Sequence, residues 1–118
     1  MDEGELKRRT KVFGLRVFKL VAALPKNVQG RAIGNQLVRC GSSVGANYRE
    51  AYRARSKPEF ISKCGDSLRE LEETACWLEL LVEANCVTAG KLSNLRQECD
   101  ELIAIFVIIL KRSKEDPS

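Results

Sequence analysis

The sequence VQGRAIGNQLVRCGSSVGANYREAYRA occupies residues 28–54 and contains no proline. Its apolar side chains Ile33, Leu37, Val44 and Tyr48 are separated by 4, 7 and 4 positions, which is the spacing of one face of an α-helix. The segment therefore predicts one long amphipathic helix, although it includes four glycines, each of which ordinarily weakens a helix by about 1 kcal/mol.

The glycines of this segment follow the same helical period. They are also separated by 4, 7 and 4 positions, which places them within an arc of about 60° on one helix face. Because glycine has no side chain, another helix can approach the backbone closely along this face. We expect that helix to belong to the same chain, and contact between subunits is the alternative. The glycines are Gly30, Gly34, Gly41 and Gly45.

Helical periodicity extends to both sides of residues 28–54. Apolar residues also recur at three and four positions within residues 5–24, 57–84 and 88–112, whereas strand-like alternation is nearly absent. Short connections separate these segments, and 118 residues suit one domain. The sequence therefore predicts a single all-α domain over residues 1–118, folded as an antiparallel up-down-up-down four-helix bundle.

The start of the third helix carries the clearest local signal. Ser56 is suited to cap the helix, and Glu59, three positions later, can reach back to complete a capping box. Pro58 is tolerated there because the first turn of a helix has amide groups without helical partners. Pro25 similarly marks the end of the first helix.

The fourth helix has more apolar surface than a monomeric bundle requires. Residues 102–110 read LIAIFVIIL and are apolar on all sides, whereas a bundle helix normally buries one stripe and exposes the other. An exposed patch of this size would promote aggregation. We therefore expect a homo-oligomer with Ile103, Phe106, Val107 and Leu110 at the subunit interface.

Charge is distributed unevenly along the chain. Residues 1–57 contain 13 Lys and Arg against 4 Asp and Glu, or +9, while residues 58–118 contain 7 against 12, or −5. The two values sum to the net charge of +4. This asymmetry indicates a basic surface, or the pairing of unlike surfaces.

An arginine stripe follows one polar face of the second predicted helix. Arg31, Arg39, Arg49 and Arg53 share this face along about 33 Å of helix axis, because the rise is about 1.5 Å per residue. Planar guanidinium groups suit phosphate oxygens, so the stripe indicates nucleic-acid binding. Two alternatives remain, a solvated face and pairing with acids of the third helix. The predicted binding residues are Arg31, Arg39, Arg49, Arg53, Arg55 and Lys57, and the predicted acidic partners are Asp66, Glu70 and Glu73.

The composition argues against several classes of function. The chain has no histidine, which disfavours general acid–base catalysis and zinc binding, and we expect no enzyme activity, metal or cofactor. Five cysteines at wide spacing read as reduced thiols, and a thiol-based redox protein is a remote alternative. An acidic start and the absence of an apolar run of roughly 20 residues predict a cytoplasmic protein with no membrane association.

Residues 35–51, which read NQLVRCGSSVGANYREA, resemble the core motif of a bacterial four-helix-bundle family, as do residues 53–61 (RARSKPEFI) and 70–81 (ELEETACWLELL). This is the family of proteins encoded in intervening sequences of 23S ribosomal RNA, which includes the accessory variability determinant of diversity-generating retroelements. Many relatives end the motif Asn-Ile-x-Glu-Gly, where this chain has Asn47-Tyr48-Arg49-Glu50-Ala51.

The resemblance implies a homopentameric barrel with a basic surface, and members from retroelements bind nucleic acid and a reverse transcriptase. Within the motif, Asn47 and Glu50 are expected to form a buried hydrogen bond at a helix or subunit interface. The leading hypothesis is a non-enzymatic homo-oligomeric accessory protein that binds structured RNA or DNA. The second is a protein–protein adaptor that docks onto a reverse transcriptase.

Overall fold

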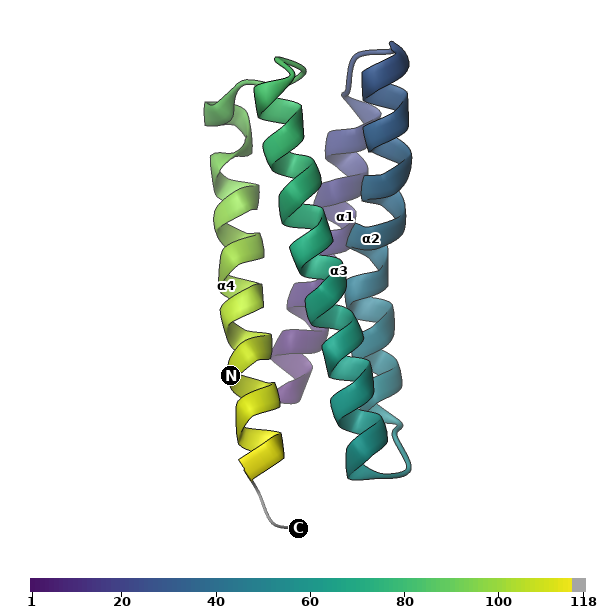
Figure 1. The fold of residues 1–118 in the computed structure, drawn as a ribbon, viewed down its shortest axis with the longest axis vertical. Helices are drawn as coiled ribbons and strands as arrows, with labels where there is room; N and C mark the ends of the chain where they lie inside the picture. Colours follow the sequence, from purple (N-terminus) through teal and green to yellow (C-terminus); the bar gives the residue numbers. More distant parts are fainter. Residues whose placement is uncertain (116–118) are drawn as a thin grey trace.

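The computed structural model of the chain describes residues 1–115, and all regular secondary structure in that part of the chain is α-helical. Four helices follow one another: α1 (Glu3–Ala22), α2 (Val28–Tyr52), α3 (Lys57–Glu83) and α4 (Ala89–Glu115). Consecutive helices run antiparallel, so the α1–α2 and α3–α4 connections share one end of the molecule and the α2–α3 connection lies at the other (Figure 1). The predicted up-down-up-down arrangement is confirmed.

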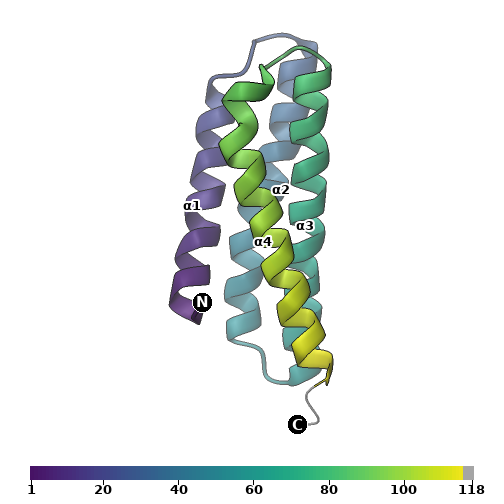
Figure 2. The same ribbon diagram turned by 90° about the vertical axis from the view of Figure 1, so that its left-hand side faces the viewer.

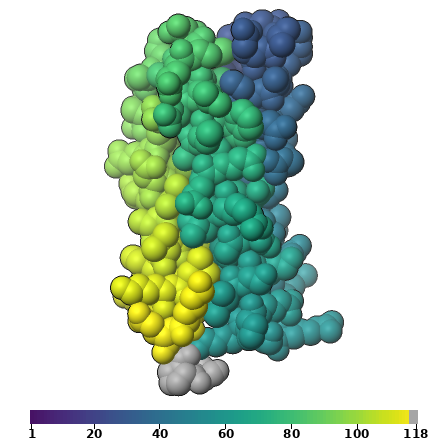
Figure 3. Space-filling view, in the orientation of Figure 1, coloured from purple at the N-terminus to yellow at the C-terminus, as the bar shows by residue number. Residues whose placement is uncertain are grey.

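The four helices form one elongated bundle of 50 × 21 × 20 Å. Each helix packs on its neighbours in sequence, and α1 also contacts α4, although this contact is the least extensive of the four. Seen from the side, α4 leans away from the beginning of α1 as it approaches its own C-terminal end (Figure 2). In the space-filling view of Figure 3, α3 and α4 form most of the face toward the viewer, and α2 forms its right-hand edge.

Polar side chains cap the beginnings of the first three helices. The Asp2 carboxylate accepts from the Glu5 amide at 2.8 Å, and the Asn27 side chain accepts from the Gly30 amide at 2.8 Å. Because Asp2 acts as the cap, α1 begins at Glu3 rather than near residue 5. It ends at Ala22 rather than near residue 24, ahead of Pro25, because proline restricts the residue that precedes it.

The predicted capping box of α3 forms only in part. The Ser56 hydroxyl accepts from the Glu59 amide at 3.2 Å, as expected for an N-cap. The Glu59 carboxylate, however, accepts from the backbone amide of Arg55 at 3.3 Å, one residue before the position that a capping box requires.

The core runs along the whole bundle axis and draws on every helix. Tyr48 of α2 packs edge-to-face on Phe106 of α4, with ring centroids 5.6 Å apart and an interplanar angle of 87°. The Ser67 hydroxyl of α3 is fully buried and donates to the Val44 carbonyl oxygen of α2 at 2.8 Å. Fully buried side chains include Phe13, Val17, Leu37, Val44, Leu71, Leu78, Leu102 and Phe106.

The glycine face of α2 packs against α1 of the same chain, as expected. A Cβ atom built at Gly41 would lie 2.9 Å from Val17 Cγ1, and one at Gly45 would lie 3.3 Å from Thr10 Oγ1. These distances leave no room for a side chain at Gly41, so the missing side chain is what lets the two helices approach each other.

The predicted subunit interface on α4 requires a correction. Phe106 is fully buried in the core of the monomer and is therefore not available to another subunit. Ile103 and Leu110 are half-buried against the same core. Val107 and Ile108 are 47% and 48% exposed, and they are the large apolar side chains of residues 102–110 that face solvent, beside the exposed Ala104.

None of the helices in residues 1–115 has the length and apolar character needed to cross a membrane.

Candidate nucleic-acid interface

The predicted arginine stripe does not remain one surface in the structure. Arg39 of α2 is paired with α3: its guanidinium donates to Glu70 Oε2 at 3.2 Å and also to the Glu73 carboxylate. Pairing with acids of the third helix, which was one of the alternatives, therefore holds for Arg39. Asp66, another of the expected acids, pairs instead with Arg69 on its own helix.

Arg31 lies at the opposite end of α2 from Arg53. Its guanidinium donates to the Lys26 carbonyl oxygen at 3.3 Å, in the connection between α1 and α2. Since that oxygen is uncharged, the positive charge of Arg31 is not neutralised there. Arg31 is nonetheless separated by about 27 Å of helix axis from Arg49 and by about 33 Å from Arg53.

Arg49 and Arg53, near the end of α2, lie beside Lys7 of α1. Together with Tyr52 these side chains line a cleft of about 310 Å³, which we call the cation cleft. The ammonium of Lys7 lies 5.6 Å from the centroid of the Tyr52 ring, a cation–π contact. Within residues 1–115, none of the three cations forms an ion pair with a carboxylate.

Tyr52 lines the cation cleft and also the neighbouring cleft that contains Lys57. Its hydroxyl oxygen is buried and has no hydrogen-bond partner in the described part of the chain. A buried hydroxyl without a partner is unfavourable, because desolvation costs it about 1–3 kcal/mol.

A second, shallower groove continues from the cation cleft between the same two helices. Its volume is about 320 Å³, and Arg49 lines both spaces. Lys11 of α1 is the other cation at this groove, and it also forms no ion pair in residues 1–115. The remaining lining residues are apolar or small: Thr10, Gly14, Leu15, Phe18, Ser42, Gly45 and Ala46.

The other two predicted cations lie beyond the end of α2. Arg55 is exposed, and Lys57 is half-buried in the first turn of α3. Lys57 lines a different cleft, whose rim includes Glu3 of α1. The structure therefore brings Arg49 and Arg53 together and leaves Arg31, Arg39 and Lys57 outside their cleft.

Lys7 and Lys11 were not predicted as binding residues. They lie four positions apart on α1, which places them on one helix face beside the apolar stripe. The spacing of Lys7 and Lys11 can be read from the sequence, but the helix that lies beside them cannot. The glycines of α2 are the one available signal, because they mark the face of α2 on which α1 packs.

Arg9 of α1, unlike Lys7 and Lys11, is paired with carboxylates of α4. Its guanidinium donates to Glu98 at 2.6 and 2.8 Å and to Glu101 at 2.8 Å, so it joins α1 to α4. The hydrogen bonds to Glu98 raise the pKa of Arg9 above its ordinary value. Arg9 therefore serves the contact between α1 and α4, the least extensive in the bundle.

The motif residues Asn47 and Glu50 do not form the expected buried hydrogen bond within the chain. Glu50 is exposed and pairs with Lys63 of α3 at 2.6 Å, which raises the pKa of Lys63. Asn47 is half-buried, and its side chain makes no hydrogen bond with another residue of 1–115.

Three of the five cysteines are buried in the bundle, and all five are free thiols. Burial raises the pKa of Cys64 to about 11 and that of Cys99 to about 12, and it raises the pKa of Cys40 as well. Because the thiolate is the reactive form, these buried thiols are poor nucleophiles at neutral pH. Residues 1–115 also contain no cluster of three or more side chains that could hold a metal ion.

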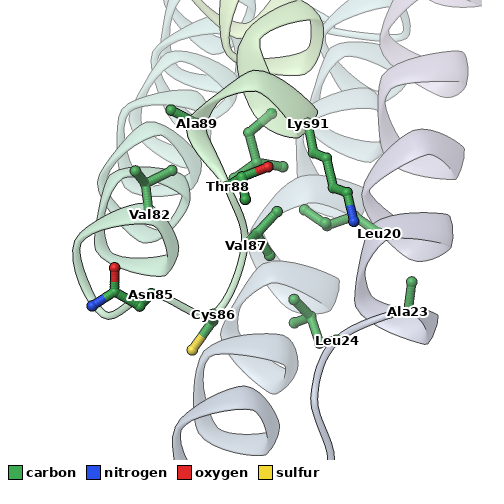
Figure 4. A pocket seen from close by; sticks show the side chains of 11 residues that line it. Leu20, Ala23, Leu24, Val82, Asn85, Cys86, Val87, Thr88, Ala89 and Lys91 are labelled. Carbon is green, nitrogen blue, oxygen red and sulfur yellow. The ribbon is translucent and has the colours of Figure 1, made fainter.

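Another cavity lies at the opposite end of the bundle, and its lining is mostly apolar. Its volume is about 470 Å³, between the end of α1 and the α3–α4 connection. Figure 4 shows Leu20, Val87 and Lys91 around it, with aliphatic side chains forming most of its walls. Lys91 is the one charged residue in its lining, so this cavity offers no cluster of charges comparable to the cation cleft.

Comparison with known proteins identifies relatives over almost the whole chain. A family model described as 23S rRNA-intervening sequence protein matches residues 3–107. The chain is 31% identical to a protein from Bacteroides thetaiotaomicron VPI-5482, described as a protein with unknown function from the S23 ribosomal protein family. The crystal structure of that protein, at 1.70 Å, superposes with a TM-score of 0.87 and covers 94% of this chain and 99% of its own. No curated protein matches the chain.

Proposed function

The chain belongs to the family of 23S rRNA-intervening sequence proteins, and from this premise we propose that it is a non-enzymatic, cytoplasmic accessory protein that binds structured RNA or DNA through phosphate contacts. The observation that carries the proposal is the cation cleft, where Lys7, Arg49 and Arg53 converge and no carboxylate lines the space. Like charges held together raise the free energy of the site, and an anion relieves that repulsion.

The chemistry of the cation cleft fits phosphate. Two guanidinium groups can each donate two hydrogen bonds to phosphate oxygens, and the Lys7 ammonium adds a compact charge. Such contacts carry no base information, so binding is weakly sequence-specific. Binding also releases counterions from the nucleic acid, so the affinity falls steeply as salt is raised.

The test is fluorescence anisotropy with a labelled RNA hairpin and a DNA hairpin of the same sequence, at about 50 and 200 mM salt. The variant Lys7→Ala/Arg49→Ala/Arg53→Ala removes the cleft charges. Lys26→Ala/Lys91→Ala/Lys111→Ala removes the same charge from exposed positions elsewhere and is the matched control. We expect the first variant to bind weakly, with a salt dependence that is shallower by about 1 for each phosphate that it no longer binds, and the second to resemble the wild type.

Circular dichroism establishes that both variants fold. Equal affinity of the two variants would show that only net charge matters and would refute a site at the cation cleft. Absence of salt-dependent binding by the wild-type protein would refute the nucleic-acid function itself.

We also propose that the protein is a homo-oligomer, a pentamer by analogy with the family resemblance. Val107 and Ile108 support this part of the proposal, because they leave apolar surface exposed on the outer side of α4. An oligomer would repeat the cation cleft around a ring, and several weak phosphate contacts on one nucleic acid would then act together. Sedimentation velocity at micromolar concentration tests it, and a monomer would refute it.

An adaptor role toward a reverse transcriptase of a diversity-generating retroelement is the alternative. It is favoured by the outer surface of α3, where Glu72, Glu79 and Glu83 are exposed on one side of Leu80, which is also exposed. An acidic surface next to an apolar side chain suits a basic protein partner. Co-purification with a reverse transcriptase encoded beside the gene, and its loss in Leu80→Arg, would favour this role.

A further inference from the structure

The groove beside the cation cleft has an apolar surface that the fold does not use. Leu15 and Phe18 of α1 are 56% and 43% exposed, although both lie on a helix whose core face is already filled by Phe13 and Val17. We call Leu15, Phe18 and the small residues beside them, Gly14, Ser42, Gly45 and Ala46, the apolar shelf.

Close packing of α1 on α2 makes the floor of the apolar shelf shallow. A Cβ atom at Gly14 would lie 3.5 Å from the Gly41 carbonyl oxygen and 3.6 Å from the Ser42 Cα. The floor consequently consists of backbone and very small side chains, with the Phe18 ring and the Leu15 side chain along one side. Such a surface accepts a flat apolar group rather than a bulky side chain.

The positive charge around the apolar shelf indicates which flat group would bind there. Lys11 and Arg49 line the apolar shelf, Arg49 also lines the cation cleft, and no acidic residue lines either space. The occupant should therefore be anionic and should carry its charge beside a planar apolar part. A nucleotide of a single strand has both features, because its base is not enclosed in a duplex and its phosphate lies next to the base.

We propose that the apolar shelf is a stacking site for an unpaired nucleobase, with the adjoining phosphate held in the cation cleft. This inference rests on the proposed nucleic-acid function and narrows it: the preferred ligand is a loop or single-stranded segment, not a continuous duplex. Phe18 supplies the aromatic face, Leu15 borders it, and Arg49 connects the base site to the phosphate site.

The experiment compares a labelled single strand of about 15 nucleotides with the blunt duplex of the same sequence at one salt concentration. The variants are Phe18→Ala, Phe18→Tyr, which keeps the ring, and Leu80→Ala, which removes an equally exposed apolar side chain from α3. We expect Phe18→Ala to weaken single-strand binding about tenfold and to leave duplex binding unchanged, because stacking contributes mainly to unpaired bases. Phe18→Tyr and Leu80→Ala should bind both ligands as the wild type does.

Three results would overturn the inference. The first is an equal loss of single-strand and duplex affinity in Phe18→Ala, and the second is no loss of either. The third is a change in the sedimentation coefficient of Phe18→Ala without nucleic acid, which would assign the apolar shelf to a contact between copies of the chain. If Lys7→Ala/Arg49→Ala/Arg53→Ala still loses binding while Phe18→Ala does not, the proposed function stands and only the stacking site fails.

Discussion

Arg39 of α2 donates to Glu70 Oε2 of α3 across 3.2 Å, so the central arginine of the stripe is committed to the contact between these two helices. Arg49, ten positions later on the same helix, is exposed and lines a cleft without a carboxylate. Two residues that a helical projection places on one polar face therefore serve different purposes. The neighbouring helix decides which of them is available, because α3 carries acids and α1 carries lysines at the facing positions.

Replacement of Arg39 by alanine should leave nucleic-acid affinity within about twofold of the wild type, since its charge is already neutralised. The free energy of unfolding should fall by about 1 kcal/mol, because half of the Arg39 side chain is exposed to solvent, which weakens its ion pairs. Denaturant unfolding and anisotropy with the RNA hairpin measure the two effects. A loss of affinity as large as that of Arg49→Ala would mean that phosphate displaces Glu70 and Glu73 from Arg39.

Gly41→Ala tests whether the close approach of α1 and α2 depends on glycine. The new Cβ would lie 2.9 Å from Val17 Cγ1 in a fully packed core, so we expect a loss of about 1–3 kcal/mol in unfolding free energy. Gly65→Ala on α3 is the control, since a Cβ there meets nothing within 4 Å. It should stabilise the protein by about 0.5–1 kcal/mol through helix propensity. Stabilisation by both substitutions would show that the helices can separate at no cost.

The fold follows from the sequence to a large extent because helical periodicity, caps and glycine spacing are local properties. Residues 28–54 alone indicated both a long helix and its close-packed face. The all-apolar segment of α4 was harder to interpret, because periodicity could not say which sides of the helix the rest of the bundle covers. Phe106 was expected at a subunit interface, yet it fills the core against Tyr48.

Only part of the candidate site could be predicted, because the sequence does not show which helices lie next to each other. Arg49 and Arg53 were recognised from their common face on one helix, but the cation cleft needs Lys7 of another helix, 42 positions from Arg49. The pairing of Arg39 with α3 had been left open as an alternative, and it is settled only by the positions of Glu70 and Glu73.

Thiol reactivity should follow burial. At pH 8, iodoacetamide should modify the exposed Cys76 first and the half-buried Cys86 more slowly, whereas Cys40, Cys64 and Cys99 should react only after unfolding. Mass spectrometry of tryptic peptides after timed labelling measures the order. Rapid modification of Cys64 in the folded protein would reveal local opening and would revive a redox role for the thiols.

The buried thiols also predict how stability depends on pH. Burial raises the pKa of Cys64 and Cys99 from an ordinary value of 9.0 to about 11 and about 12. Above pH 9 the unfolded chain loses these protons while the folded protein keeps them, so the free energy of unfolding declines as pH rises from 9 toward 12 and is unaffected by these groups below pH 9. Urea unfolding at several pH values measures this decline. Cys64→Ala/Cys99→Ala should show a smaller decline, and an unchanged one would contradict the assignment to these thiols.

Substitution of adjacent residues of α4 should lower stability to very different extents. Phe106→Ala removes a fully buried ring that packs on Tyr48 and should cost about 3–5 kcal/mol of unfolding free energy. Val107→Ser/Ile108→Ser changes only half-exposed side chains, so the monomer fold should persist with a cost below about 1 kcal/mol. If the exposed apolar surface of α4 joins copies of the chain, this second variant should sediment as a smaller species than the wild type. Identical sedimentation of an oligomeric wild type and Val107→Ser/Ile108→Ser would place the subunit contact elsewhere, with Leu15 and Phe18 of α1 as the next surface to test.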